Sequence, residues 1–104
     1  MKRGEIWWAQ QPPPIGKRPV VLLSRDEAYA VRNAVTVAQV TTTIRNIPVE
    51  IPLGKKEGLP HECVANVDTI TTIPKSFLAE RVGMLSSEKI ERINQAIKFA
   101  LSLP

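Results

Sequence analysis

Two adjacent cations, Lys17 and Arg18, stand immediately before an apolar run at residues 20–23. This Val-Val-Leu-Leu run has no alternating polar residue, which predicts a strand buried on both faces. Pro19 lacks an amide proton, fits the first position of a strand and favours an extended backbone at Arg18. The sequence therefore predicts a guanidinium fixed at the mouth of a core strand, where it is suited to bind a phosphate group.

The chain has one histidine, His61, and one cysteine, Cys63, in a loop that follows Gly58 and Pro60. A single cysteine cannot form an internal disulfide, and no second Cys/His pair is present to complete a zinc site. A single histidine also excludes, within one chain, a ribonuclease mechanism that uses two histidines. We therefore expect no metal and no cofactor, and His61 lies far in sequence from Arg18.

The elements that must hold Arg18 are mostly strands. Alternating or continuous apolar residues predict strands over residues 5–10, 19–24, 34–42, 47–53, 62–67, 68–73 and 80–85. We expect a bulge near Ala38, and a bend near Asn66 that joins the fifth and sixth of these strands. Pro48 and Pro52 mark the fourth strand as an edge strand. Helical turns are expected over 25–33 and 74–79.

The clearest helix lies at the C-terminal end of the chain. Ser86 or Ser87 caps its first turn, where Glu88 suits the positive end of the helix dipole. One apolar stripe must cover a sheet or a partner chain; it consists of Ile90, Ile93, Ile97, Ala100 and Leu101. A series of short strands followed by one helix predicts a mainly β fold, a small antiparallel barrel or curled sheet with the helix packed on it.

The size and charge of the chain indicate which class of protein it belongs to. A length of 104 residues predicts one domain, over residues 1–104. Fourteen Lys and Arg against ten Asp and Glu give a net charge of +4, which favours a polyanionic partner. No apolar run approaches the roughly 18 residues of a membrane span. The N-terminus has no signal-peptide core, so we expect a cytoplasmic protein that binds no membrane.

Five segments, in order along the chain, resemble the MazF/PemK (Kid) family of toxin endoribonucleases. They are residues 3–9 (RGEIWWA), 16–21 (GKRPVV), 37–42 (VAQVTT), 67–73 (VDTITTI) and 78–83 (LAERVG). The resemblance implies a small SH3-like or CcdB-like antiparallel barrel that forms a homodimer. It also implies metal-independent cleavage of single-stranded RNA such as mRNA. The 2′-hydroxyl would attack the adjacent phosphate, leaving a cyclic phosphate and a 5′-hydroxyl, and a cognate antitoxin would block the RNA groove.

The same resemblance assigns roles to residues of this chain. It implies that Arg18 and Thr41 are catalytic, because a fixed guanidinium and a hydroxyl donor can stabilise the charge that develops on the phosphate. The residues that it implies for RNA binding are Lys17, Gln39, Thr42, Arg45 and Asp68. The identity of the general base stays open, because an arginine does not readily give up its proton.

The chain departs from the family pattern in two places. The segment before Arg18, residues 11–17, is shorter than usual and lacks a Ser-Glu-Gln element that helps line the site. Asn66 stands where one branch of the family carries an arginine two positions before the aspartate. The shorter segment makes plausible one alternative, a family member that binds RNA without cleaving it. A second alternative is a CcdB-like toxin that binds gyrase, because such toxins share the implied fold. The chain ends FALSLP, unlike the tryptophan-bearing terminus of the gyrase-binding toxins.

Two neighbouring tryptophans, Trp7 and Trp8, lie in the first predicted strand and must point to opposite faces of it. We expect one of them in the core. The other is placed either to stack on a base or to pack at a dimer contact, and we favour packing.

Overall fold

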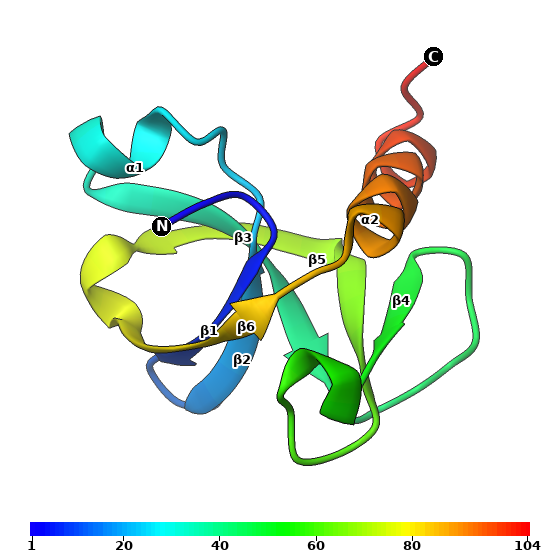
Figure 1. Cartoon of the computed structure of the whole chain (residues 1–104), viewed down its shortest axis with the longest axis horizontal. Coiled ribbons are helices and arrows are strands. Elements are labelled where there is room, and N and C mark those ends of the chain that lie inside the picture. Colours follow the sequence, from blue (N-terminus) through cyan, green and yellow to red (C-terminus); the bar gives the residue numbers. More distant parts are fainter.

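The computed structural model describes residues 1–104 and contains one six-stranded sheet, shown in Figure 1. The strands are β1 (Glu5–Gln10), β2 (Lys17–Leu22), β3 (Ala34–Thr41), β4 (Glu50–Leu53), β5 (Cys63–Pro74) and β6 (Leu78–Met84). Their order in the sheet is β4-β5-β3-β2-β1-β6, and every neighbouring pair is antiparallel. The helical segments are α1 (Ala28–Val31), η1 (Lys55–Glu57), η2 (Lys75–Phe77) and α2 (Ser87–Ala100). The expected mainly β fold with a C-terminal helix is confirmed.

A bend in β5 curls the sheet. Along β3 the partner on β5 changes from Ile70, opposite Ala38, to Asn66, opposite Gln39, so three residues of β5 are left out of the pairing. The first half of β5 pairs with both β3 and β4, and the second half pairs with β3 alone. The bulge expected near Ala38 and the bend expected near Asn66 are therefore the same feature, and the two predicted strands are one.

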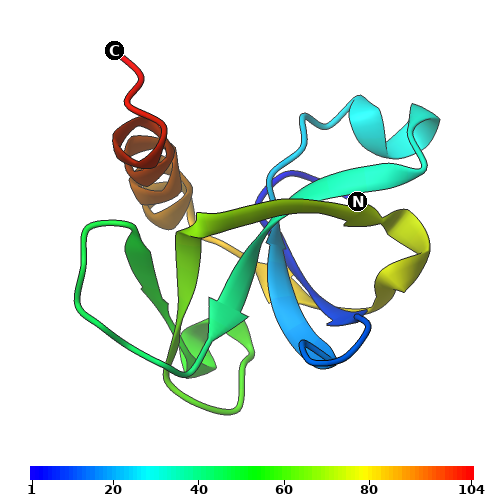
Figure 2. The ribbon, with the colours of Figure 1, turned by 180° about the vertical axis from the view of Figure 1, so that it is seen from behind.

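Two apolar cores lie on opposite sides of the curled sheet. The larger one is formed with α2 and includes Ile6, Val21, Val40, Ile51, Val67 and Ile93. The smaller one lies toward α1 and η2 and consists of Ala9, Val20, Leu22, Tyr29, Val35, Val37 and Ile73. Figure 2 shows α2 at one end of the molecule and α1 at the other, with β5 running between them. Because successive residues of β2 enter different cores, this strand is buried on both faces, as its sequence predicts.

Strand boundaries differ from the predicted ones by a few residues. β2 begins at Lys17, so Arg18 belongs to the strand itself and pairs with Ala9 of β1. At its other end, the side-chain oxygen of Ser24 accepts the amide proton of Thr36 (2.8 Å) and replaces the next backbone partner. β4 is shorter than expected because it begins only at Glu50, but it is an edge strand, as its prolines predict. β6 covers Leu78–Met84 rather than residues 80–85.

The helix α2 is capped by Ser86, whose hydroxyl accepts the amide proton of Lys89 (3.2 Å). Its buried residues are Ile93 and Ala96. The predicted stripe is wrong at its end, because Leu101 lies beyond the helix and is 57% exposed. No helix of the protein has the length and apolar character needed to cross a membrane.

Candidate active site

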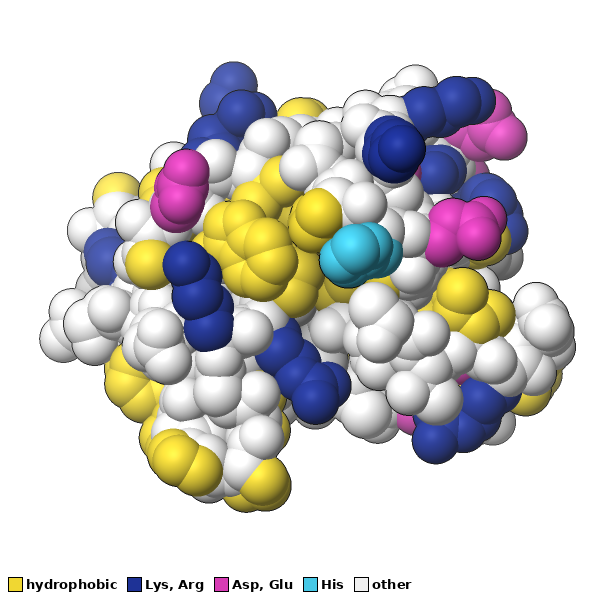
Figure 3. Space-filling view, turned by 90° about the horizontal axis from the view of Figure 1, so that it is seen from below, with side chains coloured by type: hydrophobic (Ala, Val, Ile, Leu, Met, Phe, Trp, Pro, Cys, Tyr) yellow, Lys and Arg dark blue, Asp and Glu magenta, His cyan; other side chains and the backbone are white.

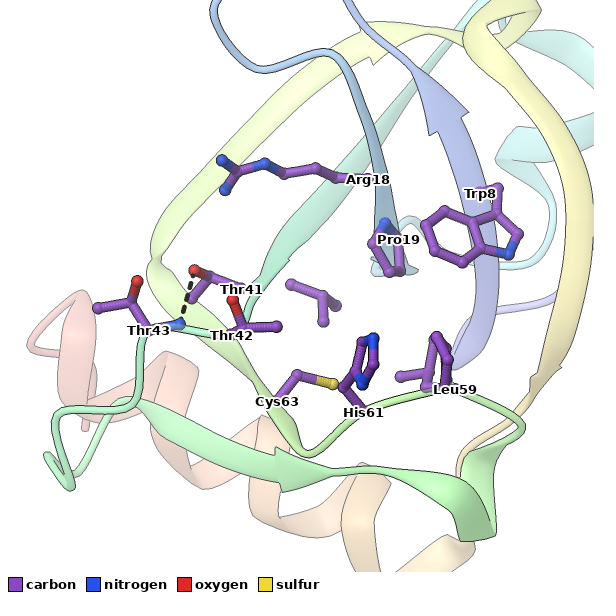
Figure 4. Close-up of a pocket in the computed structure, with 11 residues that line it drawn as sticks. Trp8, Arg18, Pro19, Thr41, Thr42, Thr43, Leu59, His61 and Cys63 are labelled. Atoms are coloured by element: carbon purple, nitrogen blue, oxygen red, sulfur yellow. Dashed lines mark hydrogen bonds between the residues drawn. The ribbon is translucent and has the colours of Figure 1, made fainter.

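Arg18 and Thr41 lie on neighbouring inner strands, near the start of β2 and at the end of β3. The register of β2 and β3 pairs Val20 with Gln39, and its continuation by two residues places Arg18 opposite Thr41. Figure 4 shows the Arg18 guanidinium above the Thr41 hydroxyl, at the rim of the pocket. The sheet pairing thus brings together the two residues to which the resemblance assigns catalytic roles.

Two adjoining hollows meet at these residues. The first has a volume of about 320 Å³ and is lined by Trp8, Arg18, Pro19, Val40, Thr41, Thr42, Thr43, Leu59, Pro60, His61 and Cys63. The second has a volume of about 410 Å³ and is lined by Ile15, Arg18, Gln39, Thr41, Thr43, Arg45, Asn66, Thr69, Ile70 and Thr71. Arg18, Thr41 and Thr43 line both. They therefore lie where the two hollows meet, at the middle of the groove that the hollows form together.

The Arg18 side chain is exposed and has no carboxylate partner. The ion pairs of the protein are Arg81 with Glu5 and Lys89 with Glu57, and neither contacts Arg18. No Asp or Glu lines either hollow. An unpaired guanidinium presents a planar set of donors that matches a phosphate, so this position is ready to bind an anion.

The Thr41 hydroxyl is oriented by the backbone that follows it. Its oxygen accepts the amide proton of Thr43 at 3.1 Å. A hydroxyl has one proton and two lone pairs, so this bond leaves the proton of Thr41 free to be donated into the groove. An anion that is held by Arg18 would receive it.

Gln39 lines the second hollow but is bonded to the segment that leads into β2. Its side-chain amide makes two reciprocal hydrogen bonds with that of Gln11, at 2.7 and 3.1 Å. Gln11 is 4% exposed although it belongs to a loop. The pair fixes the start of the short segment before Arg18, so Gln39 has a positioning role in addition to the RNA contact expected of it.

Arg45 lies in the loop between β3 and β4, and the buried carboxylate of Glu50 holds that loop. Glu50 accepts the amide protons of Arg45 and Asn46, each at 2.9 Å. Asn46 has a positive φ of 55°, a conformation that asparagine tolerates. These bonds present the Arg45 side chain along the wall of the second hollow.

The other residues expected to bind RNA are placed differently. Thr42 lines the first hollow. The Lys17 ammonium lies over the ring of Trp8, 5.5 Å from its centre, at a cation–π distance. Asp68 is exposed and lies outside both hollows, and its amide proton is donated to the side chain of Asn66 (2.9 Å). The structure therefore does not bring Asp68 to the groove.

The two tryptophans separate as expected. Trp7 packs against the smaller core and donates its indole proton to Glu5 (2.9 Å). Trp8 lines the first hollow beside Pro19, its partner on β2. In Figure 3 this face shows a hydrophobic depression with the histidine at its edge and Lys and Arg side chains around it.

His61 and Cys63 enter the first hollow although the sequence places them far from Arg18. Thr41 pairs with Val64 on β5, so the residues just before Val64 lie beside the end of β3. Only this long-range pairing brings the two residues to the hollow, and the sequence alone does not reveal it. Burial raises the pKa of the Cys63 thiol, which donates to the carbonyl of Leu53 at 3.8 Å. No group of three or more His, Cys, Asp or Glu side chains is placed to hold a metal ion.

Comparisons with known proteins agree with this architecture. A family model described as a PemK-like, MazF-like toxin of type II toxin–antitoxin systems matches residues 2–101. The chain is 35% identical over 100 residues to the probable endoribonuclease MazF5 of Mycobacterium tuberculosis, which covers 95% of this chain and 91% of that protein.

Solved structures give the same result. The Mycobacterium tuberculosis toxin MazF-mt6 matches with a TM-score of 0.90 and 32% identity over 96% of this chain and 98% of that one. An endoribonuclease in complex with its cognate antitoxin, from a mycobacterial species, matches with a TM-score of 0.86 and 27% identity over 100% of this chain and 97% of that one.

Proposed function

The chain belongs to the PemK-like, MazF-like family of type II toxins, and from this membership we propose that it is an endoribonuclease toxin whose reaction depends on Arg18 and Thr41. The observation that carries the proposal is the unpaired guanidinium opposite a hydroxyl donor at the middle of a groove. The CcdB-like alternative is not favoured, because the relatives that match nearly the whole chain are named endoribonucleases.

The proposed substrate is single-stranded RNA such as mRNA. An unpaired strand can lay its backbone along the groove and turn its bases into the two hollows. Arg45 and Lys17 add positive charge near the groove, and the net charge of +4 favours a polyanion. The polar walls of the second hollow supply donors and acceptors for base edges.

The proposed reaction is an internal phosphoryl transfer. The 2′-oxygen of the ribose attacks the adjacent phosphorus, the bond from phosphorus to the 5′-oxygen breaks, and a 2′,3′-cyclic phosphate and a 5′-hydroxyl result. Negative charge grows on the non-bridging oxygens in the transition state. Arg18 pairs with that charge, and Thr41 donates a hydrogen bond to the same group. No step in this sequence uses a metal ion.

Incubation of the purified protein with a long single-stranded RNA in EDTA tests the proposal. We expect discrete fragments whose 5′-hydroxyl ends accept phosphate from a polynucleotide kinase. Arg18→Ala should reduce the cleavage rate by about 10²-fold or more, as the loss of a preorganised donor does in other active sites. Intact RNA with the wild-type protein, or equal cleavage by Arg18→Ala, would refute the proposal, and binding without cleavage would favour the inactive alternative.

We also propose two protein partners, a second copy of this chain and a cognate antitoxin. Similar structures include a mycobacterial endoribonuclease in complex with its cognate antitoxin. A basic toxin is matched by an acidic antitoxin segment lying in the RNA groove. Light scattering of the purified chain tests the dimer, and competition between the antitoxin and RNA tests the shared groove.

A further inference from the structure

His61 is the one side chain of the first hollow whose ordinary chemistry is proton transfer near neutral pH. Figure 4 shows its imidazole between Leu59 and Cys63, pointing toward Pro19, with Arg18 and Thr41 on the opposite side of the pocket. A ribose whose 3′-phosphate lies between Arg18 and Thr41 would extend into this pocket. We propose that His61 is the general base that removes the proton of the attacking 2′-hydroxyl, an inference that rests on the proposed endoribonuclease function.

The other groups of the pocket cannot take this role. No carboxylate lines it. The other titratable groups that line the pocket are Arg18 and Cys63. The guanidinium of Arg18 does not readily give up its proton and so cannot act as a base. The Cys63 thiol is 5% exposed, its pKa is raised by burial, and its proton is donated to a carbonyl oxygen. The imidazole of His61 is therefore the group of this pocket that can accept the proton of the 2′-hydroxyl.

The loop of His61 is anchored on both sides of the exposed imidazole. Leu59 before it is 3% exposed, and its amide proton is donated to the carbonyl of Gly54 at 3.1 Å. Cys63 after it begins β5 and pairs with Leu53. Such anchors fix the backbone on both sides of His61, and a general base must lie within hydrogen-bond reach of the proton that it removes.

The proton and bond changes balance in a single step. The 2′-hydroxyl proton passes to the free ring nitrogen of neutral His61, the bond between the 2′-oxygen and phosphorus forms, and the bond between phosphorus and the 5′-oxygen breaks. The leaving 5′-oxygen takes a proton from solvent water. The imidazolium then returns its proton to water. Because the entering and leaving oxygens lie in line on opposite sides of phosphorus, one imidazole on the 2′ side serves the attack and not the departure.

Cleavage of a defined RNA under single-turnover conditions, measured from pH 5 to 9, tests the role. We expect the wild-type rate to rise with pH and then level off, because a general base acts only in its unprotonated form. His61→Gln should lose this rise with pH. At pH 7.5 it should cleave about 10²-fold more slowly than wild type, which is the lower end of the usual effect of removing a general base. Glu62→Gln, an exposed neighbour outside the pocket, is the matched control and should behave as wild type.

A bridging 5′-sulfur at the scissile bond distinguishes base from acid, because a thiolate leaves without protonation. The His61→Gln defect should persist on this substrate, and added imidazole should partly restore His61→Ala. Equal rates for His61→Gln and wild type, or a defect that vanishes with the sulfur substrate, would overturn the assignment of His61 as base. RNA left intact by the wild-type protein would instead reject the proposed function, so the two failures are distinguishable.

Discussion

The Thr41 hydroxyl accepts a hydrogen bond from the Thr43 amide, which leaves its proton free to be donated to a substrate, and this leads to a kinetic prediction. Thr41→Val keeps the shape of the side chain but removes the donor. We expect kcat to fall by about 10²-fold, as for other donors to a developing oxyanion, with a small change in KM. Thr72→Val, an exposed threonine of β5 outside both hollows, should leave both constants unchanged. A larger change in KM than in kcat would show that Thr41 only binds the substrate.

Lys17 is predicted to contact an RNA phosphate from its position over Trp8. Binding is best measured with an RNA that carries a 2′-deoxyribose at the cleavage position, because this substrate cannot react. Each phosphate contact contributes about 0.7 to the slope of log affinity against log salt for single strands. Lys17→Ala should therefore reduce the slope by about 0.7, whereas Lys98→Ala on the exposed face of α2 should not change it. An unchanged slope for Lys17→Ala would remove this residue from the interface.

At this scale the sequence predicted residues that lie in local motifs and missed those that depend on pairing. Arg18 could be proposed as a site residue because its chemistry is visible in the neighbouring residues. His61 could not, because only the pairing of Thr41 with Val64 brings its loop to the groove. Gln39 was expected to contact RNA, but nothing in the sequence showed that it pairs with Gln11.

Among the elements, the short helix η1 determines where the His61 loop begins. A Cβ added to Gly83 of β6 would lie only 2.5 Å from the carbonyl oxygen of Glu57, which is the last residue of η1. Gly83→Ala must therefore displace η1 and the loop that follows. We expect a loss of about 1–3 kcal/mol in the free energy of unfolding, the usual cost of overpacking, and a lower cleavage rate at saturating RNA.

Gly54→Ala provides the control for this prediction. Gly54 precedes η1, has an extended φ of 179°, and its Cβ would meet nothing closer than 3.9 Å. Urea unfolding should detect little change in this variant. If both alanine variants unfolded at the same urea concentration, the close approach of β6 and η1 would not constrain the loop.

Element types could be predicted well and element boundaries less well, for a physical reason. Hydrophobic patterns report which residues are buried, so the core strand after Pro19 and the edge strand around Pro52 were both predicted. A boundary depends on single hydrogen bonds. The Ser24 hydroxyl takes the place of a backbone partner at the end of β2, and a pattern of apolar residues carries no signal of such a replacement.

For the whole molecule, one ion pair ties the C-terminal helix to the far edge of the sheet. The Lys89 ammonium of α2 donates to the Glu57 carboxylate at 2.9 Å and to the carbonyl of Pro52 at 2.8 Å. Both side chains are largely buried, with exposed fractions of 22% for Lys89 and 8% for Glu57. The same carboxylate accepts the amide proton of Gly54 at 2.7 Å. These contacts join α2, β4 and η1, so their loss should affect global stability.

The pH dependence of stability tests this connection. Burial alone would raise the pKa of Glu57, but the hydrogen bonds from Lys89 and Gly54 outweigh it and hold the pKa below its ordinary value of 4.5. Because the folded pKa is the lower one, the stabilisation is present above the unfolded pKa and is lost as the pH falls through the folded pKa. Glu5, whose pKa is also lowered by bonds from Trp7 and Arg81 against the effect of burial, loses its contribution in the same acid range.

The variant Glu57→Gln distinguishes the contribution of Glu57 to stability from that of Glu5. Its urea unfolding can be followed by tryptophan fluorescence between pH 3 and 7. At pH 7 we expect the variant to be less stable by about 1.5–3 kcal/mol, the contribution of a hydrogen bond to a charged group. The difference should shrink as the pH falls below about 4.5, because the wild-type carboxyl then becomes neutral as well. The remaining acid sensitivity of the variant would come from the other carboxylates whose pKa is lowered, Glu5 and Glu91. A difference that stayed constant down to pH 3 would show that the charge of Glu57 does not hold α2 to the sheet.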